Sequence, residues 1–473
     1  DLDRTFAPGG DFDTGDLAPI YRGTDPRALP QDALNAIGAG GIYASASDLA
    51  SFGGALTGTE LLRQSSLDAM AAPEYARGIW PVSGEPDSLA YGLGWDNMEW
   101  YPFCQSDIQA LVKGGDTLYY HAGLVVLPEY DMAAAVVSSG GVSTYDQLAA
   151  NQILIAALEE DGVTVDQTVK TLPAAEPAAM PAEQLENAGY YGSTSIQYRV
   201  EISEDGTMTL STMNYPTTMP AQTFSYYSDG SFRDENQIVM LKFVEEDNGQ
   251  VYLWQKGYSS IPGLGEQPSS SYIYVKLPEN PVSPETQAAW DARSGKLYLA
   301  LNLKYTNINY PLALPAAALA TDPVNMPGYM AFDRIVDANR AEGAAQIPSL
   351  YGRDWQNITM MEQDGVEYLS LMGARYVDGT TIETLYGGPS SHSTIQADGY
   401  ARWYQIGADA AGKTLTVQVP EHGGFAVYDA NGANVAASWA WGDTSAVLPA
   451  GGWVVFAGDP GMRFHLALAE AAE

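Results

Sequence analysis

From Tyr190 onward the sequence consists of short runs in which apolar and polar residues alternate, a pattern typical of β-strands. Clusters such as Ser203–Gly206 and Glu246–Gly249 separate the runs and have the composition of hairpin turns. Before residue 315 the runs are Tyr198–Ile202, Met208–Met213, Ile238–Val244, Val251–Lys256, Tyr272–Leu277 and Lys296–Leu303. Their spacing predicts an antiparallel barrel or sandwich over 182–315. Similar runs follow an Ala/Pro-rich break at Pro315–Pro327 and predict a second β-rich domain over 316–473.

The overall composition limits the classes of partner. The 473 residues are too many for one hydrophobic core, and 46% hydrophobic with 17% charged residues describes a folded chain. A net charge of −36 repels phosphate backbones, so we expect no nucleic-acid partner; the same charge also serves solubility. With one cysteine, Cys104, and four scattered histidines, no disulfide, metal or other cofactor is expected. No apolar run approaches the roughly 20 residues of a membrane span.

The first 163 residues mix helix and strand patterns. Helical spacing predicts helices over Asp48–Leu56, capped by Ser47 or Asp48, over Leu61–Met70 and over Tyr145–Glu159. Strands are predicted over Ile108–Val112, Leu118–Leu127 and Met132–Ser138. The turn at Pro128–Asp131 predicts that the last two strands form a hairpin. The Ala/Pro/Glu-rich stretch 164–181 is predicted to be an interdomain linker that follows a first domain over 1–163.

Three segments of this first domain occur in the order found in one enzyme family. They are Gly40–Phe52, the Tyr-Gly-Leu-Gly-Trp run at Tyr91–Trp95, and Lys113–Glu129. Together they resemble the β-lactamase-related serine hydrolases, which include class C β-lactamases, D-Ala-D-Ala carboxypeptidases, D-aminopeptidases and certain esterases. The resemblance implies the C-terminal portion of an α+β, β-lactamase/transpeptidase-like domain, with an antiparallel sheet and flanking helices. Two antiparallel β-barrel or β-sandwich domains would follow, the first lipocalin-like, as in the D-aminopeptidase branch.

The resemblance also implies a chemistry, namely acyl transfer through a serine ester on a peptide, amide or ester substrate. Lys113 matches the family's cationic residue, Gly114 and Gly115 would allow close substrate approach, and the Asp116 backbone N–H would be an oxyanion donor. Gly114 replaces a hydroxyl residue, which removes a carboxylate contact. The alternative interpretation is an ordinary turn with a solvated lysine. His121 is expected to pack or to support the site, and Asp116 could pair with Lys113.

Two further motifs of the family are not found where the family has them. No Ser-x-x-Lys occurs in the sequence, and the one Tyr-x-Asn match, Tyr305–Asn307, falls in a β-rich region. The sequence starts at Asp1 without an initiator Met or signal peptide. We therefore expect an upstream segment or a complementing chain to supply the serine and the remaining sheet strands, since the sheet would otherwise expose an edge.

A non-catalytic function is the alternative. In it, a degenerate hydrolase scaffold carries β domains that bind cell-wall glycan or a protein. Trp439 and Trp441 could stack on sugars, or they could be core aromatics of the β domain. The low cysteine content, the aromatic-rich β regions and the resemblance together favour a secreted or cell-surface bacterial protein.

Overall fold

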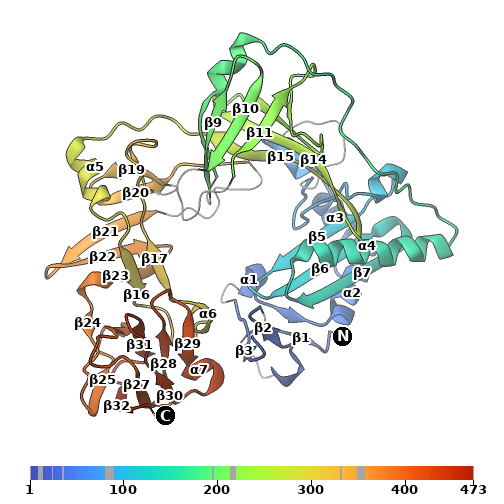
Figure 1. Ribbon diagram of the computed structural model, residues 1–473. Coiled ribbons are helices and arrows are strands. Elements are labelled where there is room, and N and C mark those ends of the chain that lie inside the picture. Colours follow the sequence, from blue (N-terminus) through green and yellow to red (C-terminus); the bar gives the residue numbers. More distant parts are fainter. Residues whose placement is uncertain are drawn as a thin grey trace. The chain divides into compact units, whose positions relative to one another are not determined.

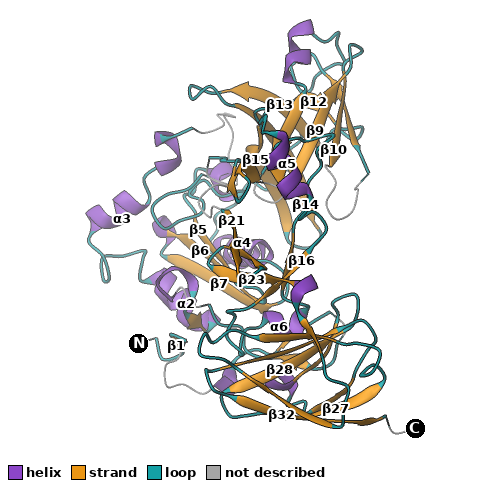
Figure 2. Ribbon diagram, turned by 90° about the vertical axis from the view of Figure 1, so that its left-hand side faces the viewer, coloured by secondary structure: helices purple, strands orange, loops and turns teal. Residues whose placement is uncertain are grey.

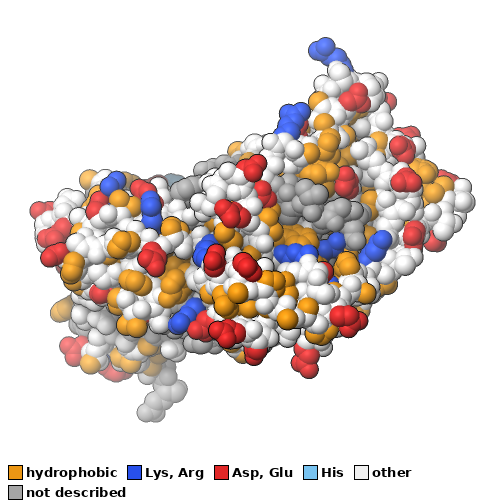
Figure 3. Space-filling view, turned by 90° about the horizontal axis from the view of Figure 1, so that it is seen from above, with side chains coloured by type: hydrophobic (Ala, Val, Ile, Leu, Met, Phe, Trp, Pro, Cys, Tyr) orange, Lys and Arg blue, Asp and Glu red, His pale blue; other side chains and the backbone are white. Residues whose placement is uncertain are grey.

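The computed structural model describes residues 2–8, 14–23, 25–34, 37–79, 90–193, 196–212, 220–330, 333–348 and 357–471 (Figure 1). The chain divides into two compact units. The first comprises residues 1–20, 32–278 and 345–354, and the second comprises residues 21–31, 279–344 and 355–473. On the face shown in Figure 3, Asp and Glu side chains are spread over the visible surface, as expected for a chain of this net charge.

A three-stranded antiparallel sheet organises the start of the first unit. Its strands are β5 (Leu111–Asp116), β6 (Tyr120–Leu127) and β7 (Met132–Ser139), in that order. A short 3-10 turn joins β6 to β7, and Leu127 pairs with Met132, so the predicted hairpin is confirmed. Successive residues of β6 face opposite sides of the sheet, because strand side chains alternate. Val125 therefore joins one apolar cluster, and Val126 joins another.

Helices cover both faces of this sheet (Figures 1 and 2). Helix α4 (Ser143–Glu160) packs Leu148, Leu154 and Leu158 against the Val125 face. Helix α2 (Ala46–Gly54) lies against the other face, where Leu49 joins the cluster of Val126. The predicted caps of α2 were wrong by two or three residues: the hydroxyl of Ser45 accepts a hydrogen bond from the backbone N–H of Asp48, at 3.1 Å.

The remaining elements of the region before the barrel are short. The helix predicted over Leu61–Met70 is confirmed as α3 (Gln64–Met70). The others are β1 (Thr5–Phe6), β2 (Ile20–Tyr21), β3 (Ala28–Leu29), α1 (Ile37–Gly40), β4 (Tyr43–Ala44) and 3-10 turns at Thr14–Asp16, Glu74–Arg77 and Phe103–Ser106. The linker predicted over 164–181 contains no helix or strand, and a 3-10 turn follows at Ala182–Asn187.

A closed eight-stranded antiparallel barrel completes the first unit. Its strands are β8 (Gly189–Gly192), β9 (Gln197–Ile202), β10 (Thr207–Thr212), β11 (Gln222–Tyr226), β12 (Phe232–Arg233), β13 (Val239–Glu245), β14 (Val251–Ile261) and β15 (Gly265–Lys276). Inward residues such as Tyr191, Phe224 and Phe232 form one buried apolar cluster. The prediction of an antiparallel barrel or sandwich is thus confirmed as a barrel, with its interior packed by aromatic side chains.

The predicted end of this β domain at residue 315 was wrong. Strand β16 (Leu297–Ala300) was assigned to it, but β16 pairs with β17 (Ala316–Ala318) and β23 (Ala374–Asp378) of another sheet. The proposed boundary therefore falls between two paired strands. Turn signals mark where strands end, but they carry no information on which distant strands pair.

Among its described residues, the second unit contains three sheets of four or more strands. The first has eight strands in the order β17-β16-β23-β22-β21-β20-β19-β18. Its remaining members are β18 (Tyr329–Met330), β19 (Asp333–Asp337), β20 (Arg340–Gly343), β21 (Ile358–Gln363) and β22 (Val366–Leu371), and helices α5 (Pro284–Asp291) and α6 (Asn309–Leu312) lie in the same stretch of chain. A five-stranded sheet, β24-β26-β31-β28-β29, and a four-stranded sheet, β25-β32-β27-β30, follow.

The last two sheets enclose one core. Phe425 and Val454 of the five-stranded sheet share an apolar cluster with Leu415 and Phe464 of the four-stranded sheet. The strands are β24 (Glu383–Thr384), β25 (Ser390–Thr394), β26 (Arg402–Gln405), β27 (Lys413–Gln418), β28 (Gly423–Tyr428), β29 (Asn434–Ala437), β30 (Ser445–Val447), β31 (Trp453–Gly458) and β32 (Arg463–Glu470), with a 3-10 turn at Gly379–Thr381 and helix α7 at Ser438–Trp441. The predicted second β-rich region is therefore present. In the part of the chain that the structure describes, every helix is too short or too polar to span a bilayer.

Candidate active site

The four predicted site residues lie together at the end of an edge strand. Lys113 to Asp116 form the second half of β5, which pairs with β6 on one side only within the sheet. On the other side, the Val112 N–H donates to the carbonyl of Asn97 at 2.9 Å, and the Gly114 N–H donates to a carboxylate oxygen of Asp96 at 2.7 Å. The outer edge is therefore covered up to Gly114.

The backbone N–H of Asp116 points to this same outer edge. Thr117 donates its N–H to the carbonyl of Tyr120 at 2.9 Å, within the turn between β5 and β6. Since successive N–H groups of a strand point in opposite directions, the N–H groups of Val112, Gly114 and Asp116 all face away from β6. The first two already have acceptors there. The Asp116 N–H therefore faces the same outer edge of β5 as these two groups.

Lys113 pairs with a carboxylate that the sequence analysis did not predict. Its Nζ atom lies 3.0 Å from Asp96, and it also donates to the carbonyl of Gly114. Both side chains are about half exposed, at 48% and 47%, so this ion pair contributes at most about 1 kcal/mol. Asp96 comes directly after the Tyr91–Trp95 segment, and this position next to a family motif was the signal in the sequence that could have identified it as a site residue.

The sequence left open whether Asp116 pairs with Lys113, and in the structure Lys113 pairs with Asp96. The Asp116 carboxylate instead contacts His121 Nδ1 at 2.6 Å and accepts hydrogen bonds from the Ser143 N–H at 2.8 Å and the Ser143 hydroxyl at 2.6 Å. Burial acts to raise the pKa of Asp116, but the hydrogen bonds from Ser143 and His121 outweigh it and lower the pKa below its usual value. These contacts fasten the end of β5 to the first residue of α4.

A second carboxylate lies in the same polar cluster. Asp146, one turn into α4, is buried and accepts a hydrogen bond from the Ser138 hydroxyl at 3.0 Å. Burial raises the pKa of Asp146, although the Ser138 hydrogen bond and the nearby His121 oppose the shift. His121 is buried beside both carboxylates, so it lies where the sequence analysis expected a packing or supporting residue.

The two glycines of the site serve different purposes. A Cβ atom on Gly114 would lie 2.5 Å from Gln147 Nε2 and 2.7 Å from Ser143 Oγ, so α4 packs directly over this position. The sequence analysis attributed this glycine to close approach of substrate, whereas in the structure the packing of α4 requires it. A Cβ atom on Gly115 would meet nothing within 4 Å, and this side of the strand is open.

Two further sequence expectations concern more distant residues. Tyr305, the Tyr of the chance Tyr-x-Asn match, belongs to the second unit and not to the β5 region. Among the described residues, no group of three or more His, Cys, Asp or Glu side chains is arranged to hold a metal ion.

Comparison with known proteins places the first part of the chain in a family. Residues 3–183 match the family model described as Beta-lactamase, so the matched domain is N-terminal in this chain. No curated protein sequence matches.

Solved structures give weaker similarities. A crystal structure of SurE is similar at 19% identity and a TM-score of 0.35, covering 57% of each chain. A complex of SurE with D-Leu gives 19%, a TM-score of 0.30 and 48% of each chain. The octameric penicillin-binding protein homologue from Pyrococcus abyssi gives 16%, a TM-score of 0.27, 58% of this chain and 57% of that one. This chain therefore spans about half the length of the solved structures that it matches.

Proposed function

Since residues 3–183 form a β-lactamase-related domain, we propose that this chain is part of a serine hydrolase that acts on a peptide, amide or ester through a covalent acyl-enzyme. The observation that carries the proposal is the outer edge of β5, where the Lys113 side chain and the Asp116 N–H lie within one short stretch of strand. A cation and an oriented backbone donor are the groups that stabilise the anion formed in acyl transfer.

Since Ser-x-x-Lys does not occur in these 473 residues, the serine would come from an upstream segment or a complementing chain. Its Oγ would attack the substrate carbonyl carbon while its proton passes to a base. The C–N or C–O bond then breaks, and the leaving amine or alcohol takes up the proton. Water finally hydrolyses the ester and restores the serine hydroxyl. In this scheme the Asp116 N–H donates to the carbonyl oxygen as that oxygen gains negative charge.

The segment that carries the serine would also complete the sheet. β7 pairs with β6 along Met132–Ser139, and in the three-strand order β5-β6-β7 it is the other edge strand. An edge strand presents a row of backbone donors and acceptors that another strand can pair with. We propose that an upstream segment, or a complementing chain, pairs with this edge. In the family, the Ser-x-x-Lys segment precedes the motifs that are present here.

Covalent labelling tests the proposal. The complete gene product and the 473-residue chain are each treated with a fluorophosphonate probe and with a fluorescent penicillin. We expect labelling of the complete product by at least one probe and none of the chain alone. Lys113→Met in the complete product should slow labelling by the fluorescent penicillin roughly 10- to 100-fold, because the cation that would bind the carboxylate of this probe is lost.

The matched control is Lys304→Met, which removes an exposed lysine of the second unit and should leave labelling unchanged. If the folded complete product is not labelled by either probe, the hydrolase proposal fails and the non-catalytic alternative is favoured.

A further inference from the structure

Two of the four histidines in the sequence lie opposite each other on an exposed sheet face of the second unit. His392 of β25 is the register partner of His465 of β32, and both strands are labelled in Figure 1. Both side chains are exposed, and neither makes a hydrogen bond or an ion pair with a described residue. The two positions are far apart in the sequence, so the histidines look scattered until the strands pair. The proposed hydrolase chemistry uses neither of them.

The register brings the two imidazole rings to one side of the sheet at short range. The Ile395 N–H donates to the carbonyl of Met462, its partner one position beyond the end of β25, at 2.9 Å. These two residues are therefore a hydrogen-bonded pair, and such pairs alternate with non-hydrogen-bonded ones along antiparallel strands. His392 lies three positions before Ile395, so it forms a non-hydrogen-bonded pair with His465. Side chains approach more closely in pairs of this kind, with Cβ atoms about 4.5–5.5 Å apart.

The opposite face of the same strands holds both histidines in place. Their neighbours Ser393 and Phe464 point inward, since successive strand residues face opposite sides. The hydroxyls of Ser393 and Tyr404 are hydrogen-bonded at 3.0 Å, and Phe464 is fully buried in the core between the two sheets. The backbone under both rings is thus ordered without a ligand, and binding costs only the freedom of two side chains.

The surroundings favour a cation over an anion. The net charge of −36 attracts cations to the chain and repels anions. Arg463 is the charged residue among the outward positions of the four described strands of this sheet. It lies two residues before His465, about 7 Å along the strand. At that distance water and salt screen its charge, so it weakens the binding of a cation only several-fold.

The ligand atoms decide which cation is preferred. The outward positions of these four strands include no Asp or Glu, and carboxylate oxygens are the ligands that Ca²⁺ and Mg²⁺ require. Imidazole nitrogens suit Zn²⁺, Ni²⁺ and Cu²⁺, and the amide of Gln418, opposite His465 on β27, adds a polar neighbour.

The distances also fit one ion. A metal–imidazole bond is about 2.0–2.1 Å long, so two such bonds bridge nitrogens up to about 4 Å apart, which the paired side chains can reach. We infer that His392 and His465 together bind one divalent transition-metal ion, with Cu²⁺ bound more tightly than Ni²⁺ or Zn²⁺. Water oxygens complete the coordination.

Metal titration of the full chain tests this inference independently of any hydrolase activity. Cu²⁺ is added in a non-coordinating buffer at pH 7.5, with excess Mg²⁺ present to occupy surface carboxylates. Calorimetry measures affinity and stoichiometry, and pulsed EPR counts the imidazoles coupled to the copper. We expect one tight site per chain with two imidazoles, and weaker binding of Zn²⁺ in competition for it. A tightest Cu²⁺ site with fewer than two imidazoles would overturn the inference.

Matched histidine variants locate the site. His392→Ala and His465→Ala should each weaken Cu²⁺ binding roughly 100-fold, because the second ligand of a chelate acts at a high effective concentration. His422→Ala is the control, since this exposed histidine lies in the turn between β27 and β28 and should leave the affinity unchanged. Melting temperatures close to that of the wild type show that these exposed substitutions leave the fold intact. Wild-type affinity in either paired variant, or an equal loss in His422→Ala, would refute the assignment.

Discussion

Replacing Asp116 by Asn is expected to loosen the start of α4. The carboxylate accepts from both the N–H and the hydroxyl of Ser143, the first residue of that helix. The residue before it, Val142, makes no side-chain cap. Asp116 therefore supplies from a neighbouring strand the acceptor and the negative charge that a helix N-terminus favours.

The magnitude follows from the contacts that change. A hydrogen bond to a charged group contributes about 1.5–3 kcal/mol, and a neutral one contributes about 0.5–1.5 kcal/mol. Asn retains one acceptor oxygen, so the two Ser143 bonds weaken and are not both lost. Because the Asp116 side chain is 44% exposed, solvent screening reduces the difference, and we expect a total loss of about 1–2 kcal/mol. That loss corresponds to roughly 5- to 30-fold faster local opening.

Hydrogen–deuterium exchange of peptides from residues 143–160 measures this opening. The pKa of Asp116 is lowered in the folded chain, so its stabilising effect is complete above the ordinary carboxyl pKa and is lost as the pH falls through the lowered value. The ratio of exchange rates between Asp116→Asn and wild type should therefore be clearly above one at pH 7 and shrink below about pH 4.

Asp68→Asn is the matched control, because the exposed Asp68 accepts a hydrogen bond from the Gln64 side chain of its own short helix, at 2.8 Å, and from no other residue that the structure describes. It should leave exchange in α4 unchanged. The reasoning would be refuted by equal exchange of Asp116→Asn and wild type at pH 7, or by a ratio that persists undiminished at pH 3.

Two further predictions concern packing and a buried acid. Gly123→Ala places a Cβ atom 2.4 Å from the backbone nitrogen of Gln147, so it should destabilise the first unit by about 1–3 kcal/mol in thermal unfolding, whereas Gly115→Ala should change stability by less than about 0.5 kcal/mol. Burial raises the pKa of Asp333 to about 7. Between about pH 4 and pH 7 this carboxyl therefore ionises in the unfolded chain but stays protonated in the folded chain, so the stability of the folded chain falls as the pH rises. Asp333→Asn should therefore stabilise the second unit by about 1–3 kcal/mol in urea denaturation at pH 8 and by much less at pH 4.

Local patterns carried most of the correct structural predictions. Strands β6 and β7 are consecutive and joined by a tight turn, so their alternation and the Pro128 turn sufficed to predict the hairpin. The 3.6-residue period likewise located α4 to within two residues at its start. In both cases the residues that determine the structure lie close together in the sequence.

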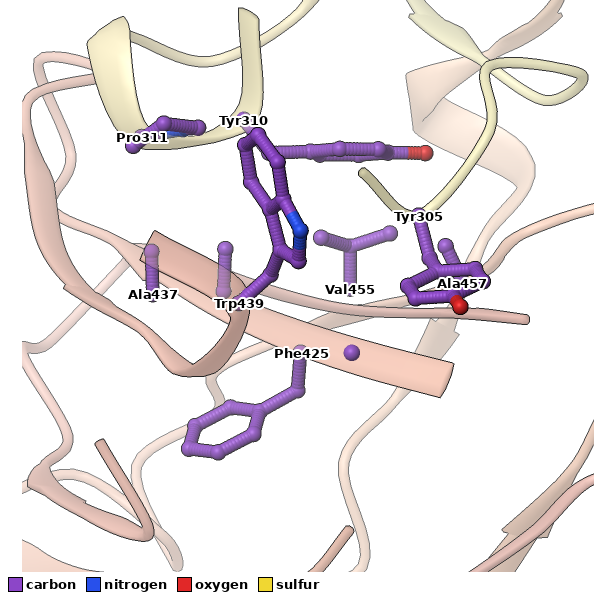
Figure 4. Close-up of a pocket in the computed structure, with 10 residues that line it drawn as sticks. Tyr305, Tyr310, Pro311, Phe425, Ala437, Trp439, Val455 and Ala457 are labelled. Atoms are coloured by element: carbon purple, nitrogen blue, oxygen red, sulfur yellow. The ribbon is translucent and has the colours of Figure 1, made fainter. Parts of the chain in front are cut away.

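Long-range contacts had no comparable signal. The bonds between Asp116 and Ser143 join residues 27 positions apart, and neither position belongs to a periodic pattern. In the pairing of β16 with β23, Leu299 lies opposite Val377, which is far away in the sequence. The alternation of apolar and polar residues in a strand does not identify the strand with which it pairs. Tyr305 and Trp439, which line one small pocket of the second unit, are likewise far apart in the sequence (Figure 4). Contacts of this kind arise from tertiary packing, and the local residue pattern of a single sequence does not predict them.

The two carboxylates around β5 have a joint consequence for the proposed chemistry. Asp116 fastens one end of the Lys113–Asp116 stretch to α4, and Asp96 holds the other end through the Gly114 N–H and the Lys113 ammonium. In the mechanism proposed above, these contacts would hold the Asp116 N–H in place before substrate arrives, which is the condition under which an oxyanion donor is most effective. Asp96 also neutralises Lys113, so a substrate carboxylate would have to displace it. Because that exposed ion pair contributes about 1 kcal/mol or less, displacement is inexpensive, and a substrate without a carboxylate loses little by leaving the pair intact.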